Sequence, residues 1–432
     1  QIRFIKCLVR LTLKIILRIL SKMKRLNVNS VFFFVATYIS LIIGFYYGEN
    51  STGGAFIDYL NQKEISKKFA SDFLGTLLTY DDNQHRHSPL ISIYLALYEK
   101  IKLSDILIRF INLQIAPICA YLFYKTLKVK FKTVNNNYLF IFSLIFLISP
   151  TVRSLAIWPD SRLFGLTFFI LSIYFYLLFL ENRQFKFVLY NIFFLALSSY
   201  FSPNFSIFSL FFLVNYFVYY KLSKSLFYIL IFNAILALPA IYYIFFLEIN
   251  FLKIAAIAYK YPLQNLNIAN KIILISTIFL FYFLPFVFTL NNFKSFLIEL
   301  FRVKNIILSL TISLICIYFF SYDKSFYGGG IFFHISRELF DNNILLYLVS
   351  FFALLLILNI SSWNKYNSLI FIILILNNPQ LSIFHKYYDP LILILIIFLI
   401  EYKIDKDILF KPKNISIFYL FSSFFLIISL LK

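Results

Sequence analysis

Charged residues are scarce in this 432-residue chain, where Asp, Glu, Lys and Arg together make up 14% of the sequence. A soluble domain carries about 25% charged residues, because its surface must be hydrated. Hydrophobic residues reach 61%, and the mean hydropathy is +0.83. These values exclude an ordinary soluble globular protein, and we expect most of the surface to face lipid.

Glycine, proline and cysteine are also rare, with 9, 11 and 3 residues. So few helix breakers predict long helices. Cys7, Cys119 and Cys316 lie far apart without companion histidines, which excludes a disulfide framework and a zinc site. The apolar segments, such as 168–180 and 391–400, are continuous rather than alternating, unlike the strands of a membrane β-barrel. The sequence therefore predicts an all-α, polytopic transmembrane helical bundle.

The chain contains no Walker loop and no Gly-x-Gly-x-x-Gly motif, so no nucleotide site is expected. Its net charge of +21 does not indicate nucleic-acid binding, because the basic residues follow the membrane topology. Residues 1–30 are predicted to form a cytoplasmic amphipathic helix at an anionic membrane surface, distinct from the membrane domain 31–432. A first transmembrane span there is the alternative. The basic stripe of this helix consists of Arg3, Lys6, Arg10, Lys14, Arg18 and Lys22.

Apolar runs predict about 11 to 13 spans. The thirteen segments are 31–47, 105–124, 137–150, 163–180, 187–201, 204–220, 225–247, 272–290, 305–320, 344–360, 368–384, 390–401 and 415–431. With the N-terminus inside, cytoplasmic segments hold 24 of the 40 Lys and Arg but 5 of the 19 Asp and Glu. This asymmetry supports the orientation. The apolar stretch 89–101 is too short to cross and is predicted to be a juxtamembrane helix within the first outer loop, 48–104.

Polar chemistry gathers in three predicted outer segments, which together contain all four histidines. The first, 48–88, holds Glu49, Asp58, Glu64, Asp72, Asp81 and Asp82, and then His85, Arg86 and His87. A carboxylate there can serve as a general base or hold a divalent cation, although a hydrated loop surface remains open for each acid. Asp58 stands out because it lies in the apolar stretch 55–60 soon after the first span.

The second outer segment, 321–343, contains three successive glycines followed by His334, Arg337 and Glu338. Glycines allow close approach of the backbone to a ligand, and Arg with His can bind a phosphate. A flexible loop is the alternative. The third segment begins at His385 and continues through Lys386 to Pro390, where cations and tyrosines can hold a lipid phosphate or anchor a helix at the interface.

The motif His87-Ser88-Pro89-Leu90, followed by an apolar helix and by Ile108-Arg109-Phe110 at the start of a long span, resembles a segment of the GT-C-type glycosyltransferases. That family includes relatives of the protein O-mannosyltransferases and of the lipid A aminoarabinose transferases. An aspartate in the first outer loop, the sequence Trp158-Pro159-Asp160-Ser161-Arg162 and the turn Lys386 to Pro390 are also similar. The chain departs from the family pattern at Tyr59, Ser88 and Lys386, where relatives often have Glu, Pro and Arg.

The resemblance implies transfer of a sugar from a polyprenyl-phosphate-linked donor to a hydroxyl of a lipid, glycan or protein on the non-cytoplasmic face of the plasma (inner) membrane. Asp58 would be the catalytic base, with Asp72, Asp81 and Asp82 as alternatives, and membrane lipids but no nucleic acid would be partners. The resemblance assigns no certain cofactor, and a divalent cation is left open. The expected phosphate-binding residues are Arg109, His334, Arg337 and Lys386. The expected substrate-positioning residues are His87, Asp160 and Tyr387.

Two other functions fit the sequence. A lipid-linked oligosaccharide polymerase or ligase also acts on lipid-bound sugars, but typically has its large arginine-bearing outer loop late in the chain. A flippase or transporter usually carries ionisable groups in mid-span and two matching halves. Here the charges lie at span ends, and the second half contains no counterpart of the first outer loop.

Overall fold

The computed structural model describes residues 27–83, 88–246, 267–289, 293–323, 328–378, 380, 382–401 and 406–431. Within these ranges the chain is helical without a β-strand, and an isolated bridge joins Gly328 to Ile383. The predicted all-α fold is therefore confirmed. The predicted basic helix at 1–30 lies outside the described residues, apart from its last positions, where α2 already begins at Val28.

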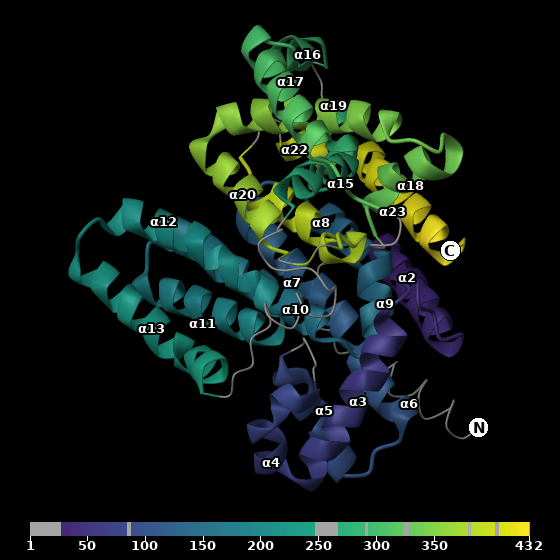
Figure 1. Ribbon diagram of the computed structural model, residues 1–432, viewed down its shortest axis with the longest axis vertical. Coiled ribbons are helices and arrows are strands. Elements are labelled where there is room, and N and C mark those ends of the chain that lie inside the picture. Colours follow the sequence, from purple (N-terminus) through teal and green to yellow (C-terminus); the bar gives the residue numbers. More distant parts are fainter. Residues whose placement is uncertain are drawn as a thin grey trace.

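The helices follow one another from α2 to α23 in Figure 1. The first half comprises α2 (Val28–Tyr46), α3 (Ala55–Ser71), α4 (Phe73–Leu78), η1 (Tyr80–Asn83), α5 (Pro89–Lys100), α6 (Asp105–Leu113), α7 (Ile115–Lys130), α8 (Asn136–Ser143), η2 (Leu144–Leu147), α9 (Pro150–Ile157), α10 (Ser161–Asn182), α11 (Phe185–Phe201), η3 (Pro203–Ile207) and α12 (Phe208–Tyr220). The second half comprises α13 (Lys224–Phe245), α15 (Ile268–Phe288), α16 (Phe293–Leu300), α17 (Val303–Tyr318), α18 (Gly330–Leu339), α19 (Ile344–Trp363), α20 (Lys365–Leu376), η5 (His385–Tyr387), α21 (Leu391–Phe398), α22 (Lys406–Leu409) and α23 (Pro412–Leu431).

Seven helical segments of the described chain are long and apolar enough to cross a membrane, or up to nine if each of two bent pairs is one span. The seven are α2, α6 with α7, α10, α13, α15, α19 and α23. The bent pairs are α8–η2 with α9 and α16 with α17. The other four predicted spans coincide with α11, α12, α20 and α21, which have 17, 13, 12 and 8 residues. Because a straight crossing needs about 20 residues, crossing by these four remains a prediction.

The predicted span 137–150 is interrupted near its end. The chain turns by 62° between Leu147 and Pro150, where α9 begins. Proline fits the first turn of a helix, which needs no N–H donor, and the Ser149 hydroxyl accepts a hydrogen bond from Val152 N. All eight residues of α9 are buried, so this helix lies inside the bundle.

The predicted span 368–384 is also shorter than expected, since α20 ends at Leu376. The described part of the following segment is irregular and largely buried, and its backbone groups find partners elsewhere. Ile383 O accepts from Gly329 N at 2.8 Å, and Asn378 O accepts from Lys271 Nζ at 2.6 Å. This segment therefore connects the start of α18 to the start of α15.

The predicted first outer loop folds into the helical layer α3, α4 and α5, seen together at the bottom of Figure 1. The helix predicted at 89–101 is confirmed as α5, which packs against α3, and its juxtamembrane position stays a prediction. The chain before it forms one long helix, α3, followed by the short α4. Asp105 Oδ1 ties α3 to α6, since Tyr59 Oη donates to it at 2.6 Å and Lys63 Nζ lies 2.5 Å away.

Helix α10 forms the centre of the bundle, because it packs against both α7 and α11. Stacked aromatic rings join α10 to α11, with Phe164 and Phe201 centred 4.9 Å apart and Phe175 and Phe194 centred 5.3 Å apart. Such pairs add to the burial of apolar surface. The packing fixes the position of the first turn of α10, which carries charged residues of the site described below.

Candidate functional site

A cavity of about 500 Å³ opens where five segments far apart in the sequence meet. They are the start of α3 with the loop before it, the start of α9, the start of α18, η5 and the end of α23. All five segments were predicted from the sequence to lie on the same side of the membrane. The polar residues that line the cavity include Ser51, Thr52, Asp58, Thr151, His334, His385 and Lys386. The three predicted outer segments therefore converge on one site.

Asp58 lies in the first turn of α3, where its backbone N–H donates to Gly54 O at 3.0 Å. Its carboxylate Oδ2 is 2.8 Å from Arg162 Nη2 and 3.7 Å from Lys386 Nζ. The side chain is 16% exposed, so water screens these ion pairs only partly. The carboxylate is therefore held between two cations.

Arg162, in the first turn of α10, holds Asp58 in place. Its Nε and Nη2 donate to the two carboxylate oxygens of Asp160 at 2.9 and 2.7 Å, a bidentate contact. Asp160 is fully buried and also caps α10 by accepting from Arg162 N at 2.8 Å. Asp160, predicted as a substrate-positioning residue, thus contacts Arg162 rather than the cavity. Arg162 belongs to the motif Trp158-Pro159-Asp160-Ser161-Arg162, but it was not among the predicted site residues.

Lys386 and Tyr387 lie in η5, directly across from the start of α3. The Lys386 side chain is 11% exposed and faces the cavity. A β-carbon at Gly54 would lie 2.8 Å from Lys386 Nζ, so the lack of a side chain there lets the ammonium group approach α3. The guanidinium group of Arg162 lies over the ring of Tyr387, with its carbon 5.4 Å from the ring centroid. Tyr387 therefore supports the arginine that holds Asp58.

His334 reaches the cavity from α18, and its Nδ1 lies 3.4 Å from Glu338 Oε1. The glycines at 328–330, which begin α18, have φ values of 79°, 94° and 81°, a region that favours glycine. A β-carbon at Gly328 would lie 2.5 Å from Ile383 O, so a side chain there would separate α18 from the segment before η5. Gly328 thus allows close packing of the backbone, and Gly328 and Gly330 also line the cavity, so the predicted approach to a ligand stays a prediction.

Arg337 lies on α18 but is not among the residues that line the cavity. Arg109 lies elsewhere as well: its guanidinium carbon is 3.5 Å from the centroid of the Trp158 ring, and its Nε donates to Ile157 O at 3.1 Å. This cation–π contact holds α6 against the end of α9. Two of the four predicted phosphate-binding residues, His334 and Lys386, therefore line the cavity.

The alternative bases lie away from the cavity or outside the described structure. Asp72 caps α4 by accepting from Gly75 N at 2.9 Å, and both Asp72 and Asp82 are exposed to solvent. The side chain of Asp81 and all of His87 lie outside the described residues. Among the described acids of the first outer loop, Asp58 is the one that lines the cavity.

Asp389 lies in the interior just behind the cavity wall. Its Oδ2 accepts from Ser149 Oγ at 2.6 Å and from Thr151 N at 3.1 Å. Burial raises the pKa of Asp389 above its usual value, whereas these hydrogen bonds oppose the shift. The aspartate thereby fixes the turn before α9, which brings Pro150 and Thr151 to the cavity.

A second polar cavity, of about 630 Å³, is lined by other helices, among them α7, α10 and α21. It is bordered by Lys130 at the end of α7, Glu181 near the end of α10 and Glu401 after α21. Arg162 and Glu181 are 19 residues apart on α10, which corresponds to about 28 Å along a helix. The segments predicted on opposite sides of the membrane thus segregate to opposite ends of the bundle.

Among the described residues, no group of three or more His, Cys, Asp and Glu side chains could hold a metal ion. Comparison with family models, curated proteins and solved structures finds no match to this chain.

Proposed function

We propose that this multi-pass membrane protein is an inverting glycosyltransferase. It transfers a sugar from a polyprenyl-phosphate-linked donor to an acceptor hydroxyl in the cavity beside Asp58, on the non-cytoplasmic face of the plasma (inner) membrane. The observation that carries the proposal is a partly buried carboxylate within 3.7 Å of Lys386, at the wall of a cavity of about 500 Å³. A base and a phosphate-binding cation at one cavity are the two groups that such a transfer needs.

In this reaction the acceptor oxygen attacks the anomeric carbon, and the bond from that carbon to the phosphate oxygen breaks. Asp58 accepts the proton of the acceptor hydroxyl, and the polyprenyl phosphate leaves with the electron pair. Lys386 and His334 stabilise the negative charge of the leaving phosphate. Arg162 is already committed to Asp160 by two hydrogen bonds, so it orients Asp58 and leaves the phosphate to Lys386.

Transport is the alternative that the geometry favours less. A transporter usually binds its substrate near the membrane midplane, on charged groups within broken spans. Here Asp58 and Arg162 occupy first turns of helices, and Lys386 lies in a short connecting segment. Polymerisation uses the same chemistry with a growing glycan as acceptor, and analysis of the reaction product distinguishes the two.

The test is Asp58→Asn in purified protein reconstituted with polyprenyl-phosphate sugar donors. A general base contributes about 10²- to 10⁴-fold, so transfer should fall at least about 100-fold. Asp58→Asn retains the shape of the side chain, and thermal unfolding of the variant checks that the protein is folded. Asp72→Asn, on the neighbouring α4 and outside the cavity, is the matched control and should retain activity. Activity of folded Asp58→Asn within twofold of the parent would refute the assignment of Asp58.

A further inference from the structure

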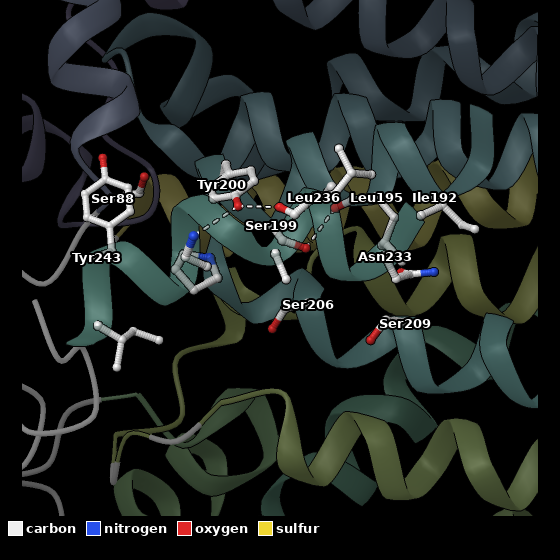
Figure 2. Close-up of a pocket in the computed structure, with 15 residues that line it drawn as sticks. Ser88, Ile192, Leu195, Ser199, Tyr200, Ser206, Ser209, Asn233, Leu236 and Tyr243 are labelled. Carbon is white, nitrogen blue, oxygen red and sulfur yellow. Dashed lines mark hydrogen bonds between the residues drawn. The ribbon is translucent and has the colours of Figure 1, made fainter. Parts of the chain in front are cut away.

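A separate groove of about 290 Å³ runs between α11, the η3–α12 segment and α13 (Figure 2). These helices lie side by side at the left of Figure 1. The groove exists because small residues face one another across it. They are Ala196 and Ser199 on α11, Ser206 on η3, and Ala237 and Ala240 on α13.

Tyr200 fixes the spacing of α11 and α13 at this groove. Its hydroxyl donates to Leu236 O at 2.6 Å and accepts from Ala240 N at 3.2 Å. It is thus inserted between the N–H and C=O groups of one turn of α13, next to Pro239. Figure 2 shows this side chain reaching from α11 to the backbone of α13. These two hydrogen bonds keep α11 and α13 at a fixed separation beside the groove.

Three polar residues of the groove already make hydrogen bonds within the bundle. Ser199 Oγ donates to Leu195 O at 2.8 Å, and Asn233 Nδ2 donates to Ile229 O at 2.9 Å. Tyr200 is held by α13 as described. These three residues therefore offer little to a sugar or a phosphate. Most of the remaining wall is apolar and includes Ile192, Leu195 and Leu236, while its polar residues are Ser88, Ser206, Ser209 and Tyr243.

The surroundings of the groove are also apolar. Helix α13 is a candidate span of which 6% is buried within the protein, and it exposes Leu230, Ile235 and Leu238. In a membrane this surface contacts lipid chains, and the groove opens along the same helix. One end of the groove lies at Ser88, which precedes α5, so that end belongs to the layer of α3, α4 and α5.

The described linings of the groove and of the Asp58 cavity have no residue in common. The groove is lined mainly by α11, α12 and α13, whereas the cavity is lined by α3, α9, α18, η5 and α23. The described lining of the groove thus offers no residue that binds the phosphate of a lipid held at Lys386. From these observations we infer that the groove holds one acyl chain of a bilayer phospholipid, from the leaflet that adjoins α5. This inference is independent of the proposed sugar transfer.

The experiment uses the full chain in nanodiscs of phosphatidylethanolamine and phosphatidylglycerol that contain a phosphatidylethanolamine with a photoreactive diazirine in one acyl chain. Peptide mass spectrometry after illumination locates the labelled residues. We expect labelling in the parent protein to concentrate on the groove residues of α11 and α13. Ala237→Trp fills the groove and should lower this labelling about fivefold or more. Leu238→Trp, one residue along the same helix but on the open lipid surface, should leave it unchanged.

Ala196→Phe fills the groove from α11 and should repeat the loss, which guards against poor folding of a single variant. Labelling spread evenly over the groove and the open face of α13 would overturn the inference, as would unchanged labelling in both filled variants. A polyprenyl phosphate diazirine probe is the comparison. If that probe labels the groove and the phospholipid probe does not, the groove belongs to the donor lipid and the inference fails.

Discussion

Two arginine–carboxylate clusters include residues of the loop after α2 or of the start of α3. They differ in whether the carboxylate that the arginine binds faces a cavity. Arg153 donates to Glu49 with Nε and Nη2, at 2.9 and 2.5 Å, and also to Ser40 and to Leu147 O. Both charged side chains are 5% exposed. Arg162 also pairs with two carboxylates, but one of them, Asp58, faces a cavity and a second cation.

We interpret the difference as that between a structural ion pair and an ion pair that takes part in the proposed reaction. In the Glu49 cluster every described contact stays within the protein, and the pair fastens the loop after α2 to the buried α9. In the Asp58 cluster Arg162 fixes one oxygen of the carboxylate, while Lys386 stands farther away and borders the open space. A substrate phosphate can attract this lysine without breaking the contact between Arg162 and Asp160. The predictions that follow change one cluster at a time.

The largest effect is expected in the Glu49 cluster. Arg153→Met leaves the buried Glu49 without its cation, and losing one partner of such a pair costs about 3–5 kcal/mol of folding stability. Thermal unfolding in detergent and the yield of folded protein measure this loss. The double variant Glu49→Leu with Arg153→Met removes both charges and should recover much of the stability. If Arg153→Met alone were as stable as the parent protein, the ion pair between Arg153 and Glu49 would not stabilise the fold.

The next effect is on activity in the Asp58 cluster. Lys386→Met removes a cation aimed at the leaving phosphate, and loss of one such group costs about 10²- to 10³-fold in turnover. We expect kcat/KM for transfer to fall about 100-fold with a small change in thermal stability, because the contact to Asp58 is 3.7 Å long. Lys63→Met is the control, since Lys63 pairs with Asp105 outside the cavity. Equal activity losses in the two lysine variants would contradict the role of Lys386.

The sequence was informative where one physical rule dominates. Long apolar runs predicted the helical bundle. The uneven distribution of Lys and Arg assigned the connecting segments to two sides, and the segments assigned to one side meet at the Asp58 cavity. Asp58 could be singled out because a carboxylate inside an apolar stretch needs a partner. The partner itself could not be predicted, since Arg162 is 104 positions away and its contact depends on how α3 packs over α10.

Helix ends and long-range contacts escaped prediction for related reasons. Apolar runs do not reveal that Pro150 starts a new buried helix or that α20 stops at Leu376. Arg109 looked like a phosphate ligand because its charge opens a span, whereas the structure stacks it on Trp158, 49 positions later. A charge near the interface is equally consistent with an aromatic partner and with a ligand, and only packing decides between them.

The smallest effect is expected outside both clusters. Asp72→Ala removes the side chain that caps α4, and loss of such a cap costs about 0.5–2 kcal/mol. The low end applies because Asp72 is exposed and α4 has six residues, so fraying affects little of the fold. Thermal unfolding should shift slightly, and transfer activity should stay within twofold of the parent, since the helix that carries Asp58 ends at Ser71. A large loss of activity in a variant that remains folded would instead indicate Asp72 as the catalytic base. The base would then lie outside the cavity beside Lys386, which would contradict the proposed site.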